Sequence, residues 1–181
     1  MSRTPLLFLV GYRGAGKTAV ARRLAGRLGW DWADADAVLE QRFGQTIREI
    51  FATAGEPDFR AKEALVLREL AERRRHVIAT GGGVILAPDN RARLRQGHVV
   101  WLTAPAPVLW QRLQGDATTG ERRPNLAGGG LAEVERLLQV RTPLYAECAD
   151  LTLDTSEASI AEVADRIAAW YEALPPGERG I

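Results

Sequence analysis

Residues 11–18 carry the one motif of this chain that restricts both the local fold and the class of ligand. They read G-Y-R-G-A-G-K-T, which matches the phosphate-binding pattern G-x-x-x-x-G-K-[ST] and adds a third glycine at Gly14. The apolar residues 6–10 precede the motif, and an amphipathic segment, 19–28, follows it. This is the strand–loop–helix setting that the motif needs. It favours a phosphate-binding loop over a glycine-rich turn that binds nothing.

Each residue type in the motif has a physical reason to be there. Glycines can adopt positive φ and let the backbone approach a phosphate without a Cβ in the way. The N–H groups of such a loop form an anion nest at the N-terminus of the following helix. Lys17 adds a mobile positive charge for the β- and γ-phosphates, and the Thr18 hydroxyl can ligate Mg²⁺. The motif therefore predicts that a nucleotide phosphate binds here.

Short apolar runs alternate with amphipathic segments along the rest of the chain, which predicts an α/β fold in a single domain, 1–181. We expect the other strands at 30–33, 76–80, 98–102 and 151–153. We expect the helices over 37–75 with a break at 55–57, from Pro88, from Pro107, over 131–144 and over 160–171. Right-handed crossovers between such strands produce a parallel sheet with helices on both faces.

Several local features follow from the same patterns. Ala61, Leu65 and Leu70 are expected to face the core, and the arginines at 73–75 are expected in the solvated last turn of their helix. Arg141 should lie at the end of its helix, just before Thr142 and Pro143, where a positive side chain is favourable for the helix dipole. Residues 115–130 have no apolar periodicity and predict a mobile loop, and the chain from Pro175 onward is expected to fray.

Chemically distinctive residues follow three of the expected strands. The phosphate loop follows the first strand, Asp34 and Asp36 follow the second, and the glycines at 81–83 follow the third. Ligands of parallel sheets bind outside the carboxyl ends of the strands, so these features predict one site. Asp36 could merely cap a helix that begins at Ala37. Beside a phosphate loop, the two acids can instead support Mg²⁺ and approach an attacking hydroxyl.

Three arginines are further candidates for the site. Arg60 and Arg141 could be ordinary surface residues, or they could form a bidentate clamp on a substrate carboxylate. Arg123 lies in the glycine-flanked loop 115–130, which could close as a lid and bring positive charge to the γ-phosphate, or could be a solvated surface loop.

Composition limits the partners and the location of the protein. The 24 Lys and Arg residues against 23 Asp and Glu give a net charge of +1, which provides no broad electrostatic footprint for nucleic acid. Arg22, Arg23 and Arg27 lie near a helix C-terminus, where they complement the helix dipole. Cys148 is the only cysteine, so an internal disulfide is excluded. The sequence contains neither a signal-peptide core nor an apolar run of membrane length, so we expect a cytoplasmic protein with no membrane partner. We also expect a monomer.

The combination of motifs resembles one enzyme family. The phosphate loop, D-A-D at 34–36, F-R-A-K-E at 59–63, G-G-G at 81–83, R-P at 123–124 and R-T-P-L-Y at 141–145 resemble shikimate kinase in order and spacing. The resemblance extends from Leu6 to about Trp170. It implies a three-layer P-loop kinase fold, similar to nucleoside monophosphate kinases, with a five-stranded parallel sheet. It also implies transfer of the ATP γ-phosphate to the 3-hydroxyl of shikimate.

The resemblance assigns a role to each candidate residue. It implies ATP contacts for Gly14, Ala15, Gly16, Lys17, Thr18, Ala19 and Arg123. Mg²⁺ would be held by Thr18 and Asp34, and the catalytic residues would be Lys17, Asp36 and Arg123. Shikimate would be bound by Asp36, Arg60, Gly82, Gly83 and Arg141 within a substrate-binding helical segment at about 34–61 and its surroundings, under a lid at about 115–130.

Other functions compete with this interpretation. A kinase of another small metabolite, such as gluconate or a nucleoside monophosphate, could use the same fold. A regulatory GTPase would need an N-K-x-D guanine-binding motif, which is absent because the only lysines, Lys17 and Lys62, follow Gly16 and Ala61. A nucleotide-binding module without catalysis would show no turnover. The residues that contact adenine stay open, because the segment between Arg112 and Arg123 is longer than in the family.

Overall fold

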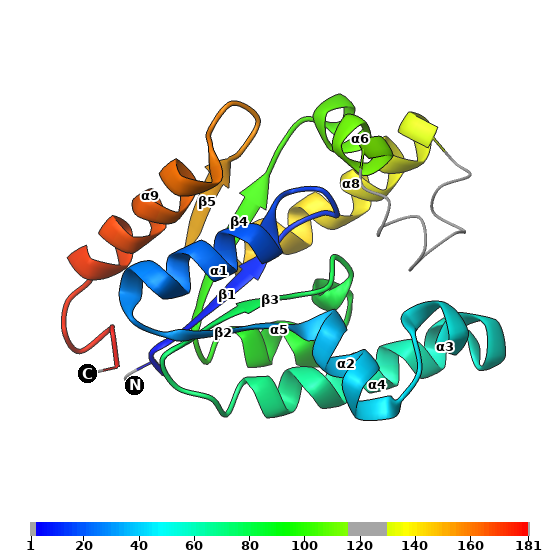
Figure 1. Cartoon of the computed structure of the whole chain (residues 1–181), viewed down its shortest axis with the longest axis horizontal. Helices are drawn as coiled ribbons and strands as arrows, with labels where there is room; N and C mark the ends of the chain where they lie inside the picture. The colour runs from blue at the N-terminus through cyan, green and yellow to red at the C-terminus, as the bar shows by residue number, and fades with distance from the viewer. Residues whose placement is uncertain (1–2, 116–129, 181) are drawn as a thin grey trace.

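A parallel sheet forms the centre of the molecule, which is described for residues 3–115 and 130–180 in a computed structural model. Strand β1 (Leu6–Val10) lies in the middle of the five-stranded order β2-β3-β1-β4-β5. The other strands are β2 (Asp31–Asp34), β3 (His76–Ala79), β4 (His98–Thr103) and β5 (Leu151–Asp154). Every pair is parallel, so the carboxyl ends of β2, β3 and β1 lie side by side at one edge (Figure 1).

Helices cover both faces of this sheet, as the α/β prediction requires. They are α1 (Lys17–Leu28), α2 (Ala35–Phe43), α3 (Ile47–Thr53), α4 (Gly55–Leu70), the 3₁₀ turn η1 (Val84–Leu86), α5 (Pro88–Leu94), α6 (Ala106–Gly115), α8 (Gly130–Cys148) and α9 (Ile160–Ala173). Helices α1 and α9 pack together on one face of the sheet, whereas α4 and α5 lie on the other (Figure 1). The predicted three-layer arrangement around a five-stranded parallel sheet is therefore confirmed.

Strand β1 divides the core between the two faces. Leu7 and Leu9 belong to the cluster beneath α1 and α9, whereas Leu6, Phe8 and Val10 belong to the cluster beneath α4 and α5. All five side chains are completely buried. Successive side chains of a strand point to opposite faces, so only a continuous apolar run can fill both cores. This burial fixes the position of the loop that leaves β1.

The second helical region differs from its prediction. The helical run breaks at Ala54, one residue before the predicted break, and also at 44–46, where no break was predicted. Residues 55–57 themselves open α4, because a proline in the first turn of a helix has no hydrogen bond to lose. The helix ends at Leu70, so the arginines at 73–75 follow it in a loop. Ala61 and Leu65 are exposed, and only Leu70 of the three predicted core residues is buried. The buried face consists of Phe59, Glu63, Val66, Leu67 and Leu70.

The prediction that Arg141 ends its helix is also wrong. Helix α8 continues through Pro143 to Cys148. An internal proline removes one backbone hydrogen bond and costs a helix about 3 kcal/mol. Tyr145 and Cys148 lie beyond the proline and are buried in the core, so apolar burial in that last turn offsets the cost. Arg141 therefore lies inside a helix, 8% exposed.

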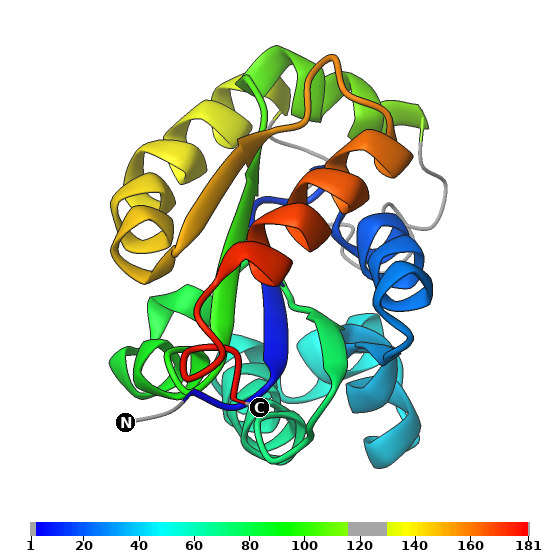
Figure 2. The ribbon, with the colours of Figure 1, turned by 90° about the vertical axis from the view of Figure 1, so that its left-hand side faces the viewer.

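The C-terminal segment, residues 175–180, packs against the sheet and does not fray as predicted. The Tyr171 hydroxyl donates to the Arg179 carbonyl oxygen at 2.8 Å, and His98 Nε2 lies 3.0 Å from the Glu178 carbonyl oxygen. Figure 2 shows this segment, in red, returning to the amino end of β1. Among the described residues, no helix combines the length and apolar character needed to cross a membrane.

His98 should make folding stability depend on pH. Its side chain is buried, which lowers its pKa below the ordinary value of about 6.5, and Arg3 lowers that pKa further. The unfolded chain then binds more protons than the folded chain below about pH 6.5, so the free energy of unfolding should decrease as the pH falls from 7 to 5.5. Urea titrations across this range should detect the decrease. His98→Gln should weaken it, whereas His76→Gln should keep it.

Candidate functional site

The phosphate loop has the backbone conformation that its glycines predicted. Gly11, Gly14 and Gly16 all have positive φ, at 141°, 79° and 90°. A Cβ on Gly11 would lie 2.2 Å from the Leu102 carbonyl oxygen, so no larger residue fits there. Helix α1 begins at Lys17 directly after this loop, which directs its unpaired N–H groups toward the loop. The predicted strand–loop–helix unit is thus present.

Lys17 is positioned over the loop by backbone oxygens. Its Nζ donates to the carbonyl oxygens of Gly11 at 2.8 Å and Tyr12 at 2.9 Å. Both acceptors are neutral, whereas phosphate oxygens are anionic and form stronger, charge-assisted hydrogen bonds. The ammonium group can therefore exchange a loop carbonyl for a phosphate oxygen with a gain in interaction energy.

Asp34 connects the loop to the end of β2. Its Oδ2 accepts from the Thr18 hydroxyl at 2.6 Å, and its Oδ1 accepts from the backbone N–H groups of Asp36 and Ala37 at 3.0 and 3.1 Å. Asp34 is therefore the N-cap of α2, which begins at Ala35. The alternative in which Asp36 caps this helix is wrong, and Asp36 lies in the first turn, partly exposed. The carboxyl end of β2 is thus followed by two carboxylates, of which Asp34 caps α2 and accepts from Thr18, whereas Asp36 does not cap the helix.

The oxygen atoms of Thr18 and Asp34 fit a magnesium ion that is completed by phosphate and water. Hydroxyl and carboxylate oxygens are hard ligands, and Mg²⁺ bound with substrate phosphates uses only one or two carboxylates from the protein. The described residues contain no group of three or more His, Cys, Asp or Glu side chains that could hold a metal ion. A Mg²⁺ ion bound together with a nucleotide is compatible with this pair.

The glycine turn 81–83 brings Arg60 and Arg141 to one place. A Cβ on Gly83 would lie 2.5 Å from Arg60 Nη1, and a Cβ on Gly82 would lie 3.6 Å from Arg141 Nη1. The Thr80 hydroxyl donates to the Leu9 carbonyl oxygen at 2.9 Å, which ties the turn to β1 beside the phosphate loop. Two arginines that are 81 positions apart in sequence thus lie beside one turn, and their binding of a carboxylate stays a prediction.

Two acids orient Arg60 from within its own helix. Glu63 accepts from its Nη1 at 2.8 Å and Glu56 accepts from its Nη2 at 3.0 Å. Burial by itself lowers the pKa of Arg60, but the charges of Glu63 and Glu56 raise that pKa above its ordinary value. The guanidinium therefore stays charged and in a defined orientation, although three of its five N–H groups already donate to these two acids. Glu63 belongs to the quoted F-R-A-K-E motif, but sequence reasoning did not give it this role.

A cleft of about 490 Å³ opens between α4 and the start of α5. Arg60, Glu63, Gly83 and Asn90 supply its polar lining, and Pro57 and Leu86 are among its apolar residues. Asn90 is 3% exposed, and its Oδ1 has no hydrogen-bond partner in the described part of the chain. Nothing in the sequence pattern separates this asparagine from an ordinary first-turn residue of α5. The cleft can accept a small polar molecule.

Arg112 contacts the phosphate loop from helix α6. Its Nη1 donates to the Gly14 carbonyl oxygen at 3.2 Å and to the Thr155 hydroxyl at 3.1 Å. This joins the loop to the segment that follows β5, where the sequence left the adenine contacts open. Arg123 and the predicted lid at 115–130 lie almost wholly outside the described residues, since 116–129 are not described. The role of Arg123 stays a prediction.

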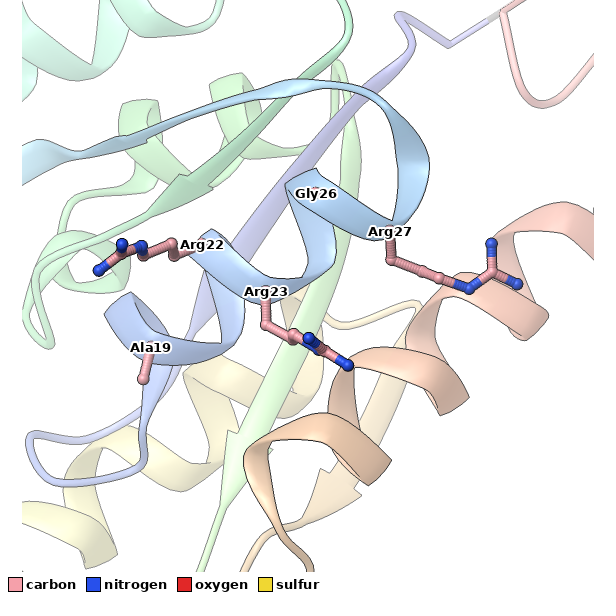
Figure 3. A pocket seen from close by; sticks show the side chains of 5 residues that line it. All are labelled: Ala19, Arg22, Arg23, Gly26 and Arg27. Carbon is pink, nitrogen blue, oxygen red and sulfur yellow. The ribbon is translucent and has the colours of Figure 1, made fainter.

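A second hollow, on helix α1, lacks the features of the first. It is lined by Ala19, Arg22, Arg23, Gly26 and Arg27. Figure 3 shows that the arginine side chains diverge, with Arg22 pointing away from Arg23 and Arg27. Arg27 already pairs with Asp165 and Glu172 of α9, at 3.7 and 3.5 Å. Divergent charges do not form a bidentate anion site. Of the three arginines, only Arg27 lies in the last turn of α1, where it complements the helix dipole as predicted.

Known proteins resemble this chain over nearly its whole length. The family model for shikimate kinase matches residues 13–172. A shikimate kinase of Rhodopirellula baltica is 45% identical over 159 residues, covering 87% of this chain and 85% of the relative. One from Symbiobacterium thermophilum is 41% identical over 177 residues, covering 96% and 99%. A solved structure of shikimate kinase from Acinetobacter baumannii in complex with shikimate superposes with a TM-score of 0.87, at 38% identity, covering 95% and 96%. This chain belongs to the shikimate kinase family.

Proposed function

We propose that this protein transfers the γ-phosphate of ATP to the 3-hydroxyl of shikimate. The strongest support for this proposal is the arrangement of residues at two neighbouring strand ends. A phosphate-binding loop and a glycine turn flanked by two arginines lie at the ends of the adjacent strands β1 and β3. The first feature suits a nucleotide and the second suits a small carboxylate. The family assignment supports this pair of ligands, and a solved relative binds shikimate.

The donor side is formed by the loop and the start of α1. Backbone N–H groups of residues 14–19 would hold the ATP phosphates, and Lys17 would neutralise charge on the phosphate that is transferred. Thr18 and Asp34 would hold Mg²⁺, Asp34 through water. When bound, that ion supplies positive charge to the phosphate oxygens. The short contact between Thr18 and Asp34 keeps both oxygens at the same side of the loop.

The acceptor side combines the segment at 34–61 with the glycine turn and α8. Arg60 and Arg141 would bind the shikimate carboxylate, and the backbone of Gly82 and Gly83 would bind ring hydroxyls. Asp36 would hold the attacking hydroxyl and accept its proton at a carboxylate oxygen. Asp36 lies in the first turn of α2, two residues after Asp34, and β2 ahead of this helix pairs with β3, which leads into the glycine turn.

A substrate comparison tests the proposal. ADP release should be measured in a coupled assay with ATP, Mg²⁺ and one acceptor at a time: shikimate, gluconate or a nucleoside monophosphate. Shikimate should be the preferred acceptor by a large factor in kcat/KM. Faster turnover with gluconate or a nucleotide would overturn the assignment, and absence of turnover with every acceptor would favour a binding module.

A methyl group at position 83 should displace Arg60 without unfolding the protein. Gly83 has φ −102°, which alanine adopts freely, but the new Cβ would lie 2.5–2.8 Å from the Arg60 guanidinium. This guanidinium is the end of a flexible side chain and can move away. Gly83→Ala should therefore raise the KM for shikimate by about ten- to a hundredfold, the factor that corresponds to loss of a charged hydrogen bond worth about 1.5–3 kcal/mol. The Tm should change little.

Gly26→Ala is the matched control for this prediction. Gly26 lies inside α1, and a Cβ there meets no atom within 4 Å. The control should be slightly more stable than the parent, because alanine is the better helix former, and its KM should be unchanged. A normal KM in Gly83→Ala would contradict the proposed contact between Arg60 and the carboxylate.

A further inference from the structure

Tyr145 is the most deeply buried polar side chain next to the proposed acceptor site. It lies one helical turn after Arg141 on α8 and is 0% exposed. Its ring stacks on Trp101 with centroids 5.6 Å apart and an interplanar angle of 22°. Its hydroxyl donates to the carbonyl oxygen of Gly82. A single side chain thus connects the helix that carries Arg141 to the glycine turn.

The Gly82 carbonyl oxygen receives a second donor from the same helix. Arg141 Nη1 lies 3.4 Å from this oxygen, a longer contact than the one made by Tyr145. The guanidinium carbon of Arg141 also lies 5.6 Å from the centre of the Tyr12 ring in the phosphate loop. Arg141 is therefore held against the turn on one side and against the loop on the other.

Because the Tyr145 hydroxyl donates to the Gly82 carbonyl oxygen, Arg141 does not have to supply the main hydrogen bond to that oxygen. A buried carbonyl without a partner is costly, so without Tyr145 the guanidinium would have to bind Gly82 more closely. That shift would turn an Arg141 donor away from a bound carboxylate. Burial also raises the pKa of Tyr145 far above its ordinary value, although Arg141 acts in the opposite direction, so the hydroxyl keeps its proton.

We propose that Tyr145 is a positioning residue for shikimate, acting through Gly82 and Arg141. Its hydroxyl fixes the turn 81–83 and leaves Arg141 free to bind the carboxylate of the acceptor. The inference rests on the proposed acceptor site, because it gives Tyr145 a role only through residues of that site. It contrasts with a purely structural role, in which the hydroxyl would stabilise the fold and leave substrate affinity unchanged.

Tyr145→Phe tests the proposal, because it removes the hydroxyl and keeps the stacked ring. The KM for shikimate, and its dissociation constant by calorimetry, should rise about fivefold, while the KM for ATP stays within twofold. Tyr171→Phe is the matched control, since Tyr171 is 4% exposed and its hydroxyl donates to a backbone carbonyl at 2.8 Å, far from the site. Both variants should lose Tm by similar amounts, but only Tyr145→Phe should lose shikimate affinity.

A third variant separates failure of this inference from failure of the proposed site. Arg141→Lys keeps the charge but cannot form a bidentate contact, so it should raise the KM for shikimate more than tenfold. If Arg141→Lys has this effect and Tyr145→Phe matches Tyr171→Phe, then the positioning role is wrong and the acceptor site stands. If neither Arg141→Lys nor Tyr145→Phe changes shikimate affinity, the acceptor site is wrong as well. A rise in the KM for ATP alone in Tyr145→Phe would also overturn the positioning role.

Discussion

Replacing Lys17 by alanine should lower kcat by about 10²–10³-fold, the usual effect of removing one donor to the charge that develops in a transition state. ATP binding should weaken much less, because the backbone N–H groups of the loop remain. Lys17 is held by the Gly11 and Tyr12 carbonyl oxygens, so it is already close to the phosphates that it would contact. Steady-state kinetics with ATP varied at saturating shikimate would measure both constants.

Lys62→Ala is the control for this variant, because Lys62 is the only other lysine of the chain. Its ammonium group pairs with Asp58 on the same helix and lies 5.1 Å from the centre of the Phe43 ring. Lys62 is partly buried, but neither it nor Asp58 is proposed to contact ATP or shikimate, so kcat should stay near that of the parent. If Lys17→Ala raised the KM for ATP and left kcat unchanged, Lys17 would serve binding and not phosphoryl transfer.

Asp36→Asn should lower kcat by about 10²–10⁴-fold, the range that positioned general bases contribute. The substitution keeps the shape of the side chain and removes its ability to accept a proton. Folding should be unaffected, because Asp34 and not Asp36 provides the N-cap of α2. The kcat of the purified variant, measured together with its Tm, would distinguish a loss of catalytic activity from a loss of folded structure.

Asp31→Asn is a matched control at the other end of β2, where the side chain is exposed. It should leave kcat and both KM values unchanged. A raised KM for shikimate in Asp36→Asn with near-normal kcat would mean that Asp36 binds hydroxyls and does not accept the proton. Near-normal values of both constants would contradict every role proposed for this carboxylate.

The parts of the fold that depend on local pattern were predictable. The first strand was predicted at its observed bounds, 6–10, because a buried central strand needs a continuous apolar run. The other four strands were predicted to within one residue at each end. Ala61 and Leu65 were assigned to the core wrongly, because several stripes of α4 contain apolar residues. Only packing against β1, α2 and α3 selects the stripe with Phe59 and Leu67.

The predictions for the segments after residues 141 and 175 were wrong for a common reason. Sequence rules treat a proline as a helix end and a polar terminus as frayed, which are the outcomes when nothing else contacts the segment. Here Tyr145 and Cys148 gain burial beyond Pro143, and the backbone of Glu178 and Arg179 gains partners in His98 and Tyr171. Such long-range contacts have no signature within a few residues.

By itself, the sequence determined the phosphate loop, the parallel order of strand and helix, and the residue types gathered near the strand ends. These follow from short-range rules: glycines that permit positive φ, a lysine within the loop, and apolar periodicity. Only the tertiary structure decided that Asp34 caps α2 while it binds Thr18, that Glu63 orients Arg60, and that Tyr145 holds Gly82 beside Arg141. Each of those contacts depends on how separate elements pack, and a hydrogen bond exists only at the distance that this packing sets.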